Sequence, residues 1–133
     1  MKALLDTHVV LWWQADGKRL SRRARRAIDG ADELLISPLT CWEIATLARL
    51  GRIKLDRDAV SWSRALLGLD RASTALLTPE AGAWAGQLGD AFGGDPIDRL
   101  LYATARDYRV PLISKDQRLR AFARVARDVE VIW

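Results

Sequence analysis

Lys2-Ala3-Leu4-Leu5-Asp6-Thr7-His8 opens the chain with a short apolar run that ends at an acid. Residues 2–5 have the character of a buried strand, and the apolar segment 8–14 that follows predicts the start of a helix. In sheets built from strand–helix units, functional sites form outside the carboxyl ends of the strands. Asp6 stands at such a position, which makes it the first candidate site residue.

The rest of the chain repeats this alternation. Further strands are predicted at 33–37, 75–78, 110–114 and 129–133. Helix start signals are Ser21, Ser37-Pro38, Asp56 or Asp58, Pro79-Glu80, Asp95-Pro96 and Asp116, and Gly30 and Gly51 are matching stops. Alternating strands and helices of this kind predict an α/β domain built around a mainly parallel sheet.

Length and composition fit one globular domain covering residues 1–133. Half of the 133 residues are hydrophobic and 29% are charged, a balance typical of a folded protein. The single Cys41 excludes an internal disulfide and a cysteine-based zinc cluster, and the single His8 excludes most histidine-rich metal sites. Asp6 comes too early for a signal peptide, and no apolar run approaches the ~20 residues of a membrane span. We therefore expect a cytoplasmic protein with no membrane partner.

Four acids stand in or beside strongly apolar runs: Asp6, Glu43, Asp98 and Asp116. A carboxylate is rarely buried unless it is paired or holds a cation, and four carboxylates drawn together repel one another. A divalent metal ion relieves this repulsion, and a ligand set made only of oxygen favours Mg²⁺ or Mn²⁺. The acids therefore predict a metal site that takes one or two such ions.

Helix capping is the alternative explanation for most of these acids. Asp6, Asp95 and Asp116 each precede a predicted helix, and Asp98 stands where the acid of a capping box would lie. Glu43 has no such explanation, because its helical neighbours Leu39, Leu47 and Leu50 are apolar. Capping accounts for each aspartate singly but explains four acids in this fold pattern less well than a shared site does.

Basic residues are concentrated in one short segment. The net charge is +4, and Arg22, Arg23, Arg25 and Arg26 share a stretch without any acid. Such a stripe favours a polyanion such as RNA, although a solvated helix face would have the same composition. Metal-dependent nucleases need both features, positive charge for the nucleic-acid backbone and carboxylates for the cations.

Taken together, the motifs resemble PIN-domain ribonucleases, in particular the VapC-type toxins of bacterial type II toxin–antitoxin pairs. The resemblance covers essentially the whole chain. It rests on Leu4-Leu5-Asp6-Thr7-His8, Leu11-Trp12, Ser37-Pro38, Trp42-Glu43-Ile44, Gly51-Arg52-Ile53, Asp95-Pro96-Ile97-Asp98-Arg99-Leu100-Leu101, Leu112-Ile113-Ser114-Lys115-Asp116 and Val131-Ile132-Trp133. Each motif is weak alone, whereas their order and spacing together are specific. One departure is Gly93, where members of this subgroup often carry a histidine.

The resemblance implies a PIN-like three-layer fold with a sheet of four to five strands flanked by helices. It also implies a Mg²⁺- or Mn²⁺-dependent endoribonuclease whose acidic quartet is Asp6, Glu43, Asp98 and Asp116. Asp95 would be an accessory acid, and the hydroxyls of Thr7 and Ser114 would line the site. The partners implied are RNA and a cognate antitoxin, and we expect a homodimer. The expected antitoxin contacts beside the acids are Leu11, Trp12, Trp13, Trp42 and Leu47.

Other functional classes compete with this one. A housekeeping PIN-type ribonuclease in RNA processing, or a non-catalytic module that binds nucleic acid or a partner, stays open on the sequence alone. A phosphatase of the haloacid dehalogenase type needs a second aspartate two residues after the first, and that position holds His8. A phosphoacceptor receiver domain is disfavoured, because it needs paired acids near the first strand and one acceptor aspartate at mid-chain.

Overall fold

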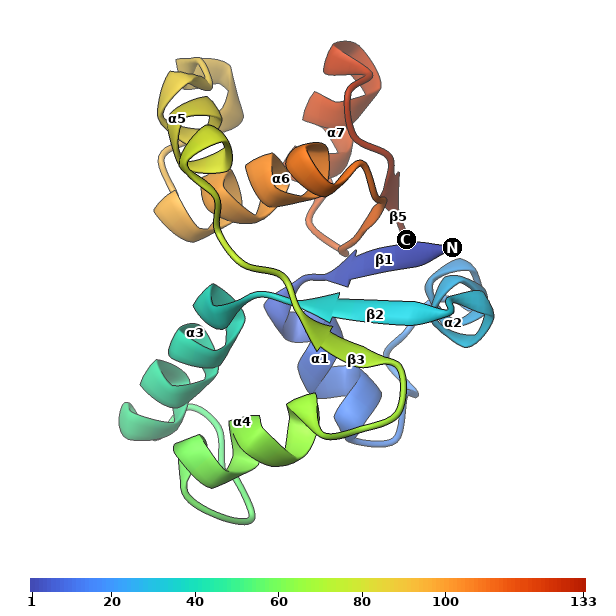
Figure 1. The fold of residues 1–133 in the computed structure, drawn as a ribbon, viewed down its shortest axis with the longest axis vertical. Coiled ribbons are helices and arrows are strands. Elements are labelled where there is room, and N and C mark those ends of the chain that lie inside the picture. The colour runs from blue at the N-terminus through green and yellow to red at the C-terminus, as the bar shows by residue number, and fades with distance from the viewer.

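The computed structural model describes residues 1–133 and contains one five-stranded sheet (Figure 1). Every strand pair in the order β3-β2-β1-β4-β5 is parallel. The predicted sheet of four to five strands is therefore confirmed, and it is wholly parallel. The strands are β1 (Lys2–Leu5), β2 (Glu33–Ile36), β3 (Ala72–Thr74), β4 (Leu112–Ile113) and β5 (Val131–Ile132).

Seven α-helices and one short 3₁₀ helix connect the strands. They are α1 (Thr7–Gln14), α2 (Arg22–Gly30), α3 (Pro38–Arg49), α4 (Ala59–Leu67), α5 (Pro79–Gln87), η1 (Asp90–Phe92), α6 (Pro96–Tyr108) and α7 (Gln117–Ala126). The predicted N-caps Ser21, Ser37 and Asp58 are confirmed, because each side chain accepts a hydrogen bond from a backbone N–H of the first turn. The stop at Gly51 is confirmed by its φ of +72°, a conformation that favours glycine.

The third strand was predicted at 75–78, and that position is wrong. Its sheet pairing runs from Ala72 to Thr74, next to β2. The apolar residues after Ala75 leave the sheet instead: Leu76 is 63% exposed, and its backbone N–H donates to the hydroxyl of Tyr108. An edge strand is held by backbone hydrogen bonds, so its own composition need not be apolar.

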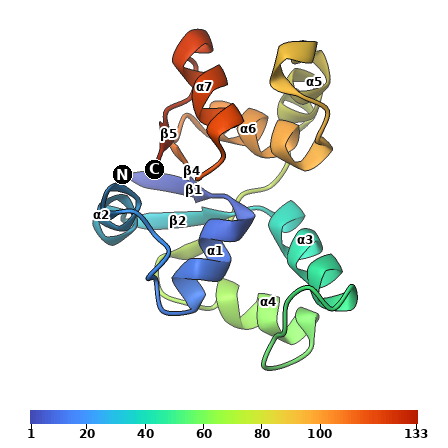
Figure 2. The same ribbon diagram turned by 180° about the vertical axis from the view of Figure 1, so that it is seen from behind.

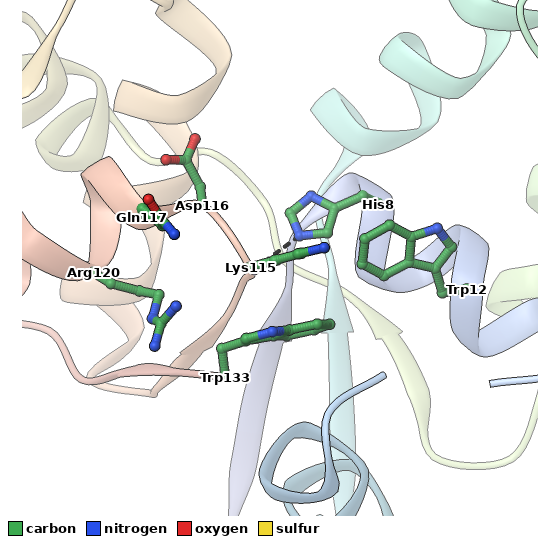
Figure 3. A pocket seen from close by; sticks show the side chains of 7 residues that line it. All are labelled: His8, Trp12, Lys115, Asp116, Gln117, Arg120 and Trp133. Carbon is green, nitrogen blue, oxygen red and sulfur yellow. Dashed lines mark hydrogen bonds between the residues drawn. The ribbon is translucent and has the colours of Figure 1, made fainter. Parts of the chain in front are cut away.

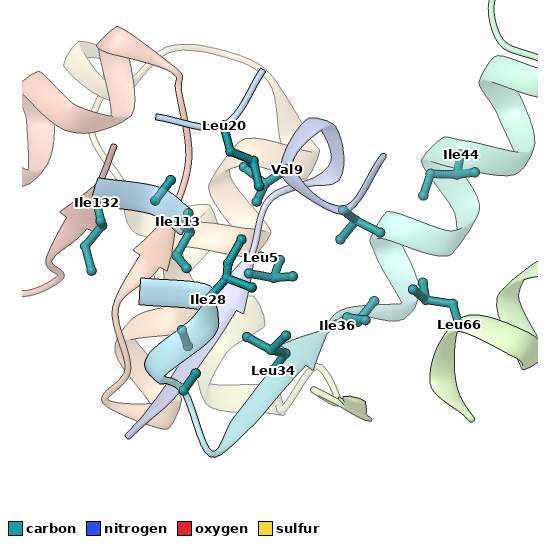
Figure 4. Packing of buried hydrophobic residues seen from close by; sticks show 14 residues of the cluster. Leu5, Val9, Leu20, Ile28, Leu34, Ile36, Ile44, Leu66, Ile113 and Ile132 are labelled. Atoms are coloured by element: carbon teal, nitrogen blue, oxygen red, sulfur yellow. The ribbon is translucent and has the colours of Figure 1, made fainter. Parts of the chain in front are cut away.

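Both faces of the sheet are buried, and alternate strand residues serve opposite layers. Leu5, Leu34 and Ile113 point into a cluster shared with α1, α2, α3 and α4 (Figure 4). Leu4 and Leu112 point the other way, into a cluster completed by residues of α6 and α7. Two helical layers thus sandwich the sheet, as expected for the three-layer architecture (Figure 2).

The strand order places a topological switch point at the centre of the sheet. The chain runs outward from β1 to β2 and β3, then returns to pair β4 on the other side of β1. The carboxyl ends of β1 and β4 therefore lie side by side, and ligands of open α/β sheets bind outside such a point. None of the helices is long and apolar enough to cross a membrane.

Candidate active site

Asp6 lies directly after β1 and is held on both carboxylate oxygens. It is only 4% exposed. Its Oδ1 accepts the backbone N–H of Thr7 at 2.7 Å, and its Oδ2 accepts the hydroxyl of Ser114 at 2.7 Å. Asp6 is thus a helix cap for α1, as the capping alternative predicts, and it is also the acid placed at the switch point.

Ser114 joins the ends of β1 and β4. Its buried hydroxyl donates to Asp6 and accepts the backbone N–H of Asp116 at 3.1 Å. Asp116 caps α7, because its Oδ1 accepts the N–H groups of Arg118 and Leu119. Its Oδ2 accepts no hydrogen bond within the chain, so capping does not occupy the whole carboxylate.

Glu43 reaches the same region from α3. Its carboxylate is half-buried, and the Thr7 side chain beside it acts to lower its pKa. The Thr7 hydroxyl also lies 3.3 Å from that of Thr40, which precedes Glu43 by nearly one helical turn. Thr7 therefore lies between Asp6 and Glu43.

Asp95 and Asp98 come from the start of α6. Oδ1 of Asp95 accepts the N–H groups of Ile97 at 2.9 Å and of Asp98 at 3.2 Å, so Asp95 is the predicted N-cap. The capping box suggested for Asp98 is absent, since its side chain makes no hydrogen bond within the chain. Its nearest charged partner is the guanidinium of Arg118, 4.0 Å away.

The electrostatics show that all five carboxylates share one region. Burial raises the pKa of Asp98 to about 7, and so do the charges of Asp95, Asp6, Asp116 and Glu43. Burial also raises the pKa of Glu43, with further increases from Asp6 and Asp95, while the neighbouring Thr7 and His8 side chains oppose them. Burial and the repulsion between these carboxylates together favour the protonated form of Asp98 near neutral pH.

The donor set fits a divalent cation, but the side chains do not yet enclose one. No three His, Cys, Asp or Glu side chains converge closely enough to form a metal-binding group. The cluster offers only carboxylate and hydroxyl oxygens together with surplus negative charge, the combination that hard divalent ions require. Arg118 offsets part of that charge from a solvent-exposed position 3.9 Å from Asp116.

Comparisons with known proteins agree with this geometry. The PIN domain family matches residues 3–127. Ribonuclease VapC22 of Mycobacterium tuberculosis is 43% identical over 118 residues, which cover 89% of this chain and 89% of that protein. This chain belongs to the PIN-domain family, in its VapC-type branch.

Solved structures with the same fold come from toxin–antitoxin complexes. VapBC-1 of nontypeable Haemophilus influenzae has a chain that is 16% identical with a TM-score of 0.68, covering 98% of this PIN domain and 96% of that chain. VapBC2 of Rickettsia felis, bound to a DNA fragment from its promoter, has a chain that is 11% identical with a TM-score of 0.66 and coverages of 98% and 97%. At these identities the likeness concerns the fold.

Three further residues of this PIN domain organise the site, and two of them, Arg99 and Arg118, were missed from the sequence. His8 accepts the backbone N–H of Lys115 on Nε2 at 2.9 Å, and its Nδ1 lies 3.6 Å from Oδ2 of Asp6. Arg99 donates to carbonyl oxygens of the loop before α6. Arg118 faces two of the acids. The motif Asp98-Arg99 was one available signal; the contacts themselves are tertiary.

The predicted RNA-binding arginines lie elsewhere on this PIN domain. Arg22, Arg23, Arg25 and Arg26 are exposed on α2, beside the starts of β1 and β2 rather than their carboxyl ends (Figure 1). Arg25 donates to the carbonyl of Gly17 at 2.6 Å and so also fixes a loop. Arg23 lies 3.6 Å from Glu130. The structure thus separates this basic surface from the acids.

Proposed function

We propose that this protein is a metal-dependent endoribonuclease and the toxin of a type II toxin–antitoxin pair. The observation that carries the proposal is the cluster of five carboxylates outside the ends of β1 and β4, where burial together with the neighbouring charges raises the pKa of Asp98 to about 7. Membership of the VapC-type PIN family supports the same activity. A structural role alone does not explain a cluster that costs stability when it is ionised.

Asp6, Glu43, Asp98 and Asp116 would hold one or two Mg²⁺ or Mn²⁺ ions. A bound divalent ion supplies an activated water nucleophile and neutralises charge that develops on the leaving oxygen of the phosphodiester. Asp98 must lose its proton to become a ligand, so metal binding and deprotonation are coupled at this residue. Asp95 adds negative charge beside Asp98 and fixes the start of α6.

The hydroxyl residues orient the acids. Ser114 and the Thr7 backbone hold the Asp6 carboxylate in one orientation through two short hydrogen bonds. The Thr7 side chain lies beside Glu43 and favours its ionised form. Fixed ligands of this kind lower the reorganisation needed when a substrate phosphate arrives. Thr7 and Ser114 are therefore positioning residues for the cleavage reaction.

The arginines of α2 are proposed to contact the phosphate backbone of a longer RNA. Their distance from the acids means that they would bind the strand away from the scissile bond. Such contacts position a nucleic acid without reading its sequence. Arg22 and Arg26 are the members of the set that are free of hydrogen bonds and ion pairs within the chain.

A cognate antitoxin is the proposed protein partner. An apolar hollow of about 360 Å³ between α3 and α4 is lined by Trp42, Val60 and Leu67 among others, and Trp42 is 59% exposed. An amphipathic segment of the antitoxin would fill this hollow close to Glu43. Trp12 lines a different pocket. The residues expected to contact the antitoxin therefore lie on two separate surfaces. A homodimer remains part of the proposal, and light scattering of the purified toxin tests it.

Cleavage of a structured RNA tests the enzymatic claim. With Mn²⁺ or Mg²⁺ the wild-type protein should cut the RNA, and a chelator should stop it. Asp6→Asn, Glu43→Gln, Asp98→Asn and Asp116→Asn should each slow cleavage by at least about 100-fold. Asp90→Asn, an exposed acid outside the cluster, is the matched control and should cleave normally. Metal-independent cleavage, or a wild-type rate in Asp6→Asn, would show that the site is assigned wrongly.

A growth assay distinguishes the toxin from a housekeeping ribonuclease and from a non-catalytic binding module. Strong expression of the wild-type protein alone should arrest growth, Asp6→Asn should not, and a co-expressed antitoxin should restore growth. A housekeeping ribonuclease would cleave RNA without arresting growth. A non-catalytic binding module would act equally well with its acids replaced.

A further inference from the structure

A pocket of about 580 Å³ opens beside the acids and is not used by the cleavage chemistry. It is lined by His8, Trp12, Lys115, Asp116, Gln117, Arg120 and Trp133, and is called the Trp133 pocket below. Figure 3 shows the residues at the start of α7 on one side of it and the aromatic rings on the other. Because Asp116 belongs both to this pocket and to the carboxylate cluster, whatever fills the pocket lies next to the reacting phosphate.

Three aromatic rings form one wall of the pocket. The ring centroids of His8 and Trp12 are 5.0 Å apart, those of Trp12 and Trp133 are 5.7 Å apart, and those of His8 and Trp133 are 6.3 Å apart. The rings are inclined by 53–70°, so none of them stacks face to face on another. Trp12 and Trp133 also pack against the buried core, which fixes their orientation before any ligand arrives.

Trp133 is the ring left free for a ligand. Cationic groups already lie over Trp12, with the Lys115 ammonium 5.6 Å and the Arg19 guanidinium 5.8 Å from its ring centroid. No cation lies over Trp133. A fixed indole at the wall of a pocket this large offers a platform on which a planar ring can stack.

The opposite wall supplies polar groups without partners. Gln117 and Arg120 make no side-chain hydrogen bond or ion pair within the chain. The Gln117 amide can both donate to and accept from the edge of a planar heterocycle, and Arg120 can donate to a phosphate. A ligand that brings together a flat ring and an anion matches this wall as well as the aromatic one.

The basic groove that continues from the pocket favours RNA over a peptide. A second hollow shares Arg120 and Trp133 with the pocket and adds Arg124 and Arg23. Glu130 lies there too, paired with Arg23 at 3.6 Å, whereas Arg120 and Arg124 have no acidic partner. A line of uncompensated cations beside an aromatic platform is the usual arrangement for single-stranded nucleic acid.

We propose that the Trp133 pocket binds one unstacked base of a single-stranded RNA, next to the bond that is cut. The base stacks on Trp133, Gln117 contacts its edge, and Arg120 with Arg124 holds the adjoining phosphates. Paired RNA keeps its bases stacked, so this subsite selects loops and single strands as substrates. The inference rests on the proposed ribonuclease function and adds the element of the substrate that is recognised.

Binding of short RNA to a full-length inactive protein tests the subsite. In an Asp98→Asn background, Trp133→Leu should weaken binding of a single-stranded RNA oligonucleotide by roughly 5- to 150-fold, as expected for the loss of one stacked base. Trp133→Phe keeps a ring and should bind within a few-fold of the parent. Trp84→Leu, which alters a partly exposed tryptophan on α5 outside the pocket, is the matched control and should bind unchanged. Fluorescence anisotropy gives the affinities.

Oligonucleotides that lack one base at a time test the subsite without altering the protein. One abasic position should weaken binding to the parent by a similar factor and should have no effect on Trp133→Leu. The proposal is overturned if no position has such an effect, or if Trp133→Leu binds RNA like the parent. If Trp133→Leu loses antitoxin binding and keeps RNA binding, the proposal is likewise overturned and the pocket belongs to the protein partner.

A parallel cleavage assay of the protein with an intact Asp98 distinguishes this inference from the proposed function. Cleavage in Mn²⁺ together with unchanged RNA binding by Trp133→Leu would refute only the base-binding pocket. A protein that neither cleaves nor binds single-stranded RNA would refute both.

Discussion

Asp98 is the acid of the site whose ionisation the folded protein opposes most strongly. Burial and four neighbouring carboxylates raise its pKa from 3.8 to about 7. The folded protein therefore holds a proton at Asp98 over a pH range in which the unfolded chain has lost it. Stability then falls as the pH rises from about 4 to about 7, because the folded state binds more protons than the unfolded state does.

The first prediction follows from this fall in stability with rising pH. Without metal, the wild-type protein should lose stability between about pH 4 and about pH 7 relative to Asp98→Asn, whose side chain does not titrate. Urea unfolding in the presence of a chelator measures the difference in free energy of unfolding across the range. Asp90→Asn should follow the wild-type pH profile. If Asp98→Asn follows it as well, Asp98 does not carry the raised pKa.

Ser114 supports a second prediction at the same scale. Its hydroxyl joins Asp6 to the backbone of Asp116. Ser114→Ala should lower the free energy of unfolding by about 1.5–3 kcal/mol, the range for a hydrogen bond to a charged group. It should also weaken Mn²⁺ binding by roughly 10- to 100-fold, as the loss of a residue that orients a ligand does. Ser63→Ala on α4 is the control, and equal Mn²⁺ affinities in the two variants would contradict the role.

At the level of elements, the loop before α6 is fixed by one side chain. Arg99 donates to the carbonyl oxygens of Gly93 and Leu88 at 2.6 Å, of Ala85 at 3.2 Å and of Gly89 at 3.3 Å. The same loop precedes Asp95 and passes through Gly93, whose φ of +101° favours glycine. That conformation gives a physical reason for glycine at position 93.

Replacing Arg99 should therefore disturb the metal site from outside it. Arg99→Gln should destabilise the fold by about 1–3 kcal/mol and should weaken Mn²⁺ binding, since the start of α6 loses its anchor. Arg106→Gln, on the same helix but away from the loop, should leave Mn²⁺ affinity unchanged. Thermal melting and calorimetric titration measure the two effects. Unaltered Mn²⁺ affinity in Arg99→Gln would mean that the helix start is rigid without this anchor.

The basic helix α2 gives a prediction on RNA binding. Arg22→Gln combined with Arg26→Gln should flatten the dependence of RNA affinity on salt, by up to ~0.7 log units for each phosphate that the protein no longer neutralises. Arg25 is left in place because it fixes a loop. Binding of a long RNA at several salt concentrations measures the slope. An unchanged slope would return α2 to the role of a solvated helix face.

The sequence predicts a structural feature well when the physical cause of that feature lies within a few residues along the chain. The caps at Ser21, Ser37 and Asp95 were predictable, because a capping side chain bonds its own first turn. β1 was placed correctly, since a central strand buried on both faces is continuously apolar. The edge strand β3 was misplaced because pairing with β2, rather than its own residues, decides where it lies.

The site divides in the same way. The acids were predictable as candidates, since each stands out against apolar neighbours. The contacts of His8 and Arg118 were not predictable, because they leave no local pattern in the sequence. His8 contacts a residue more than a hundred positions away, and Arg118 contacts one about twenty positions away. The Trp133 pocket also depends on contacts between the two ends of the chain.

For the whole molecule, the sheet order is what assembles the site. Placing β1 between β2 and β4 brings the four acids to one edge of the sheet. Asp6 and Asp116 follow strands β1 and β4, Glu43 lies on α3, and Asp98 lies on α6. The fold thereby holds like charges together that would separate in an unfolded chain. A divalent ion that binds only the folded state would add about 2.7 kcal/mol of stability at a hundredfold excess over its dissociation constant.

Direct titration with Mn²⁺ tests the central claim that these carboxylates form a metal site. Calorimetry at about pH 7 should show one or two ions bound by the wild-type protein. Proton release should accompany binding, and it is measured by repeating the titration in buffers of different ionisation enthalpy. Asp6→Asn/Asp98→Asn should bind at least about 100-fold more weakly and release fewer protons. Equal binding by the two proteins, or no binding by the wild type, would contradict the metal site.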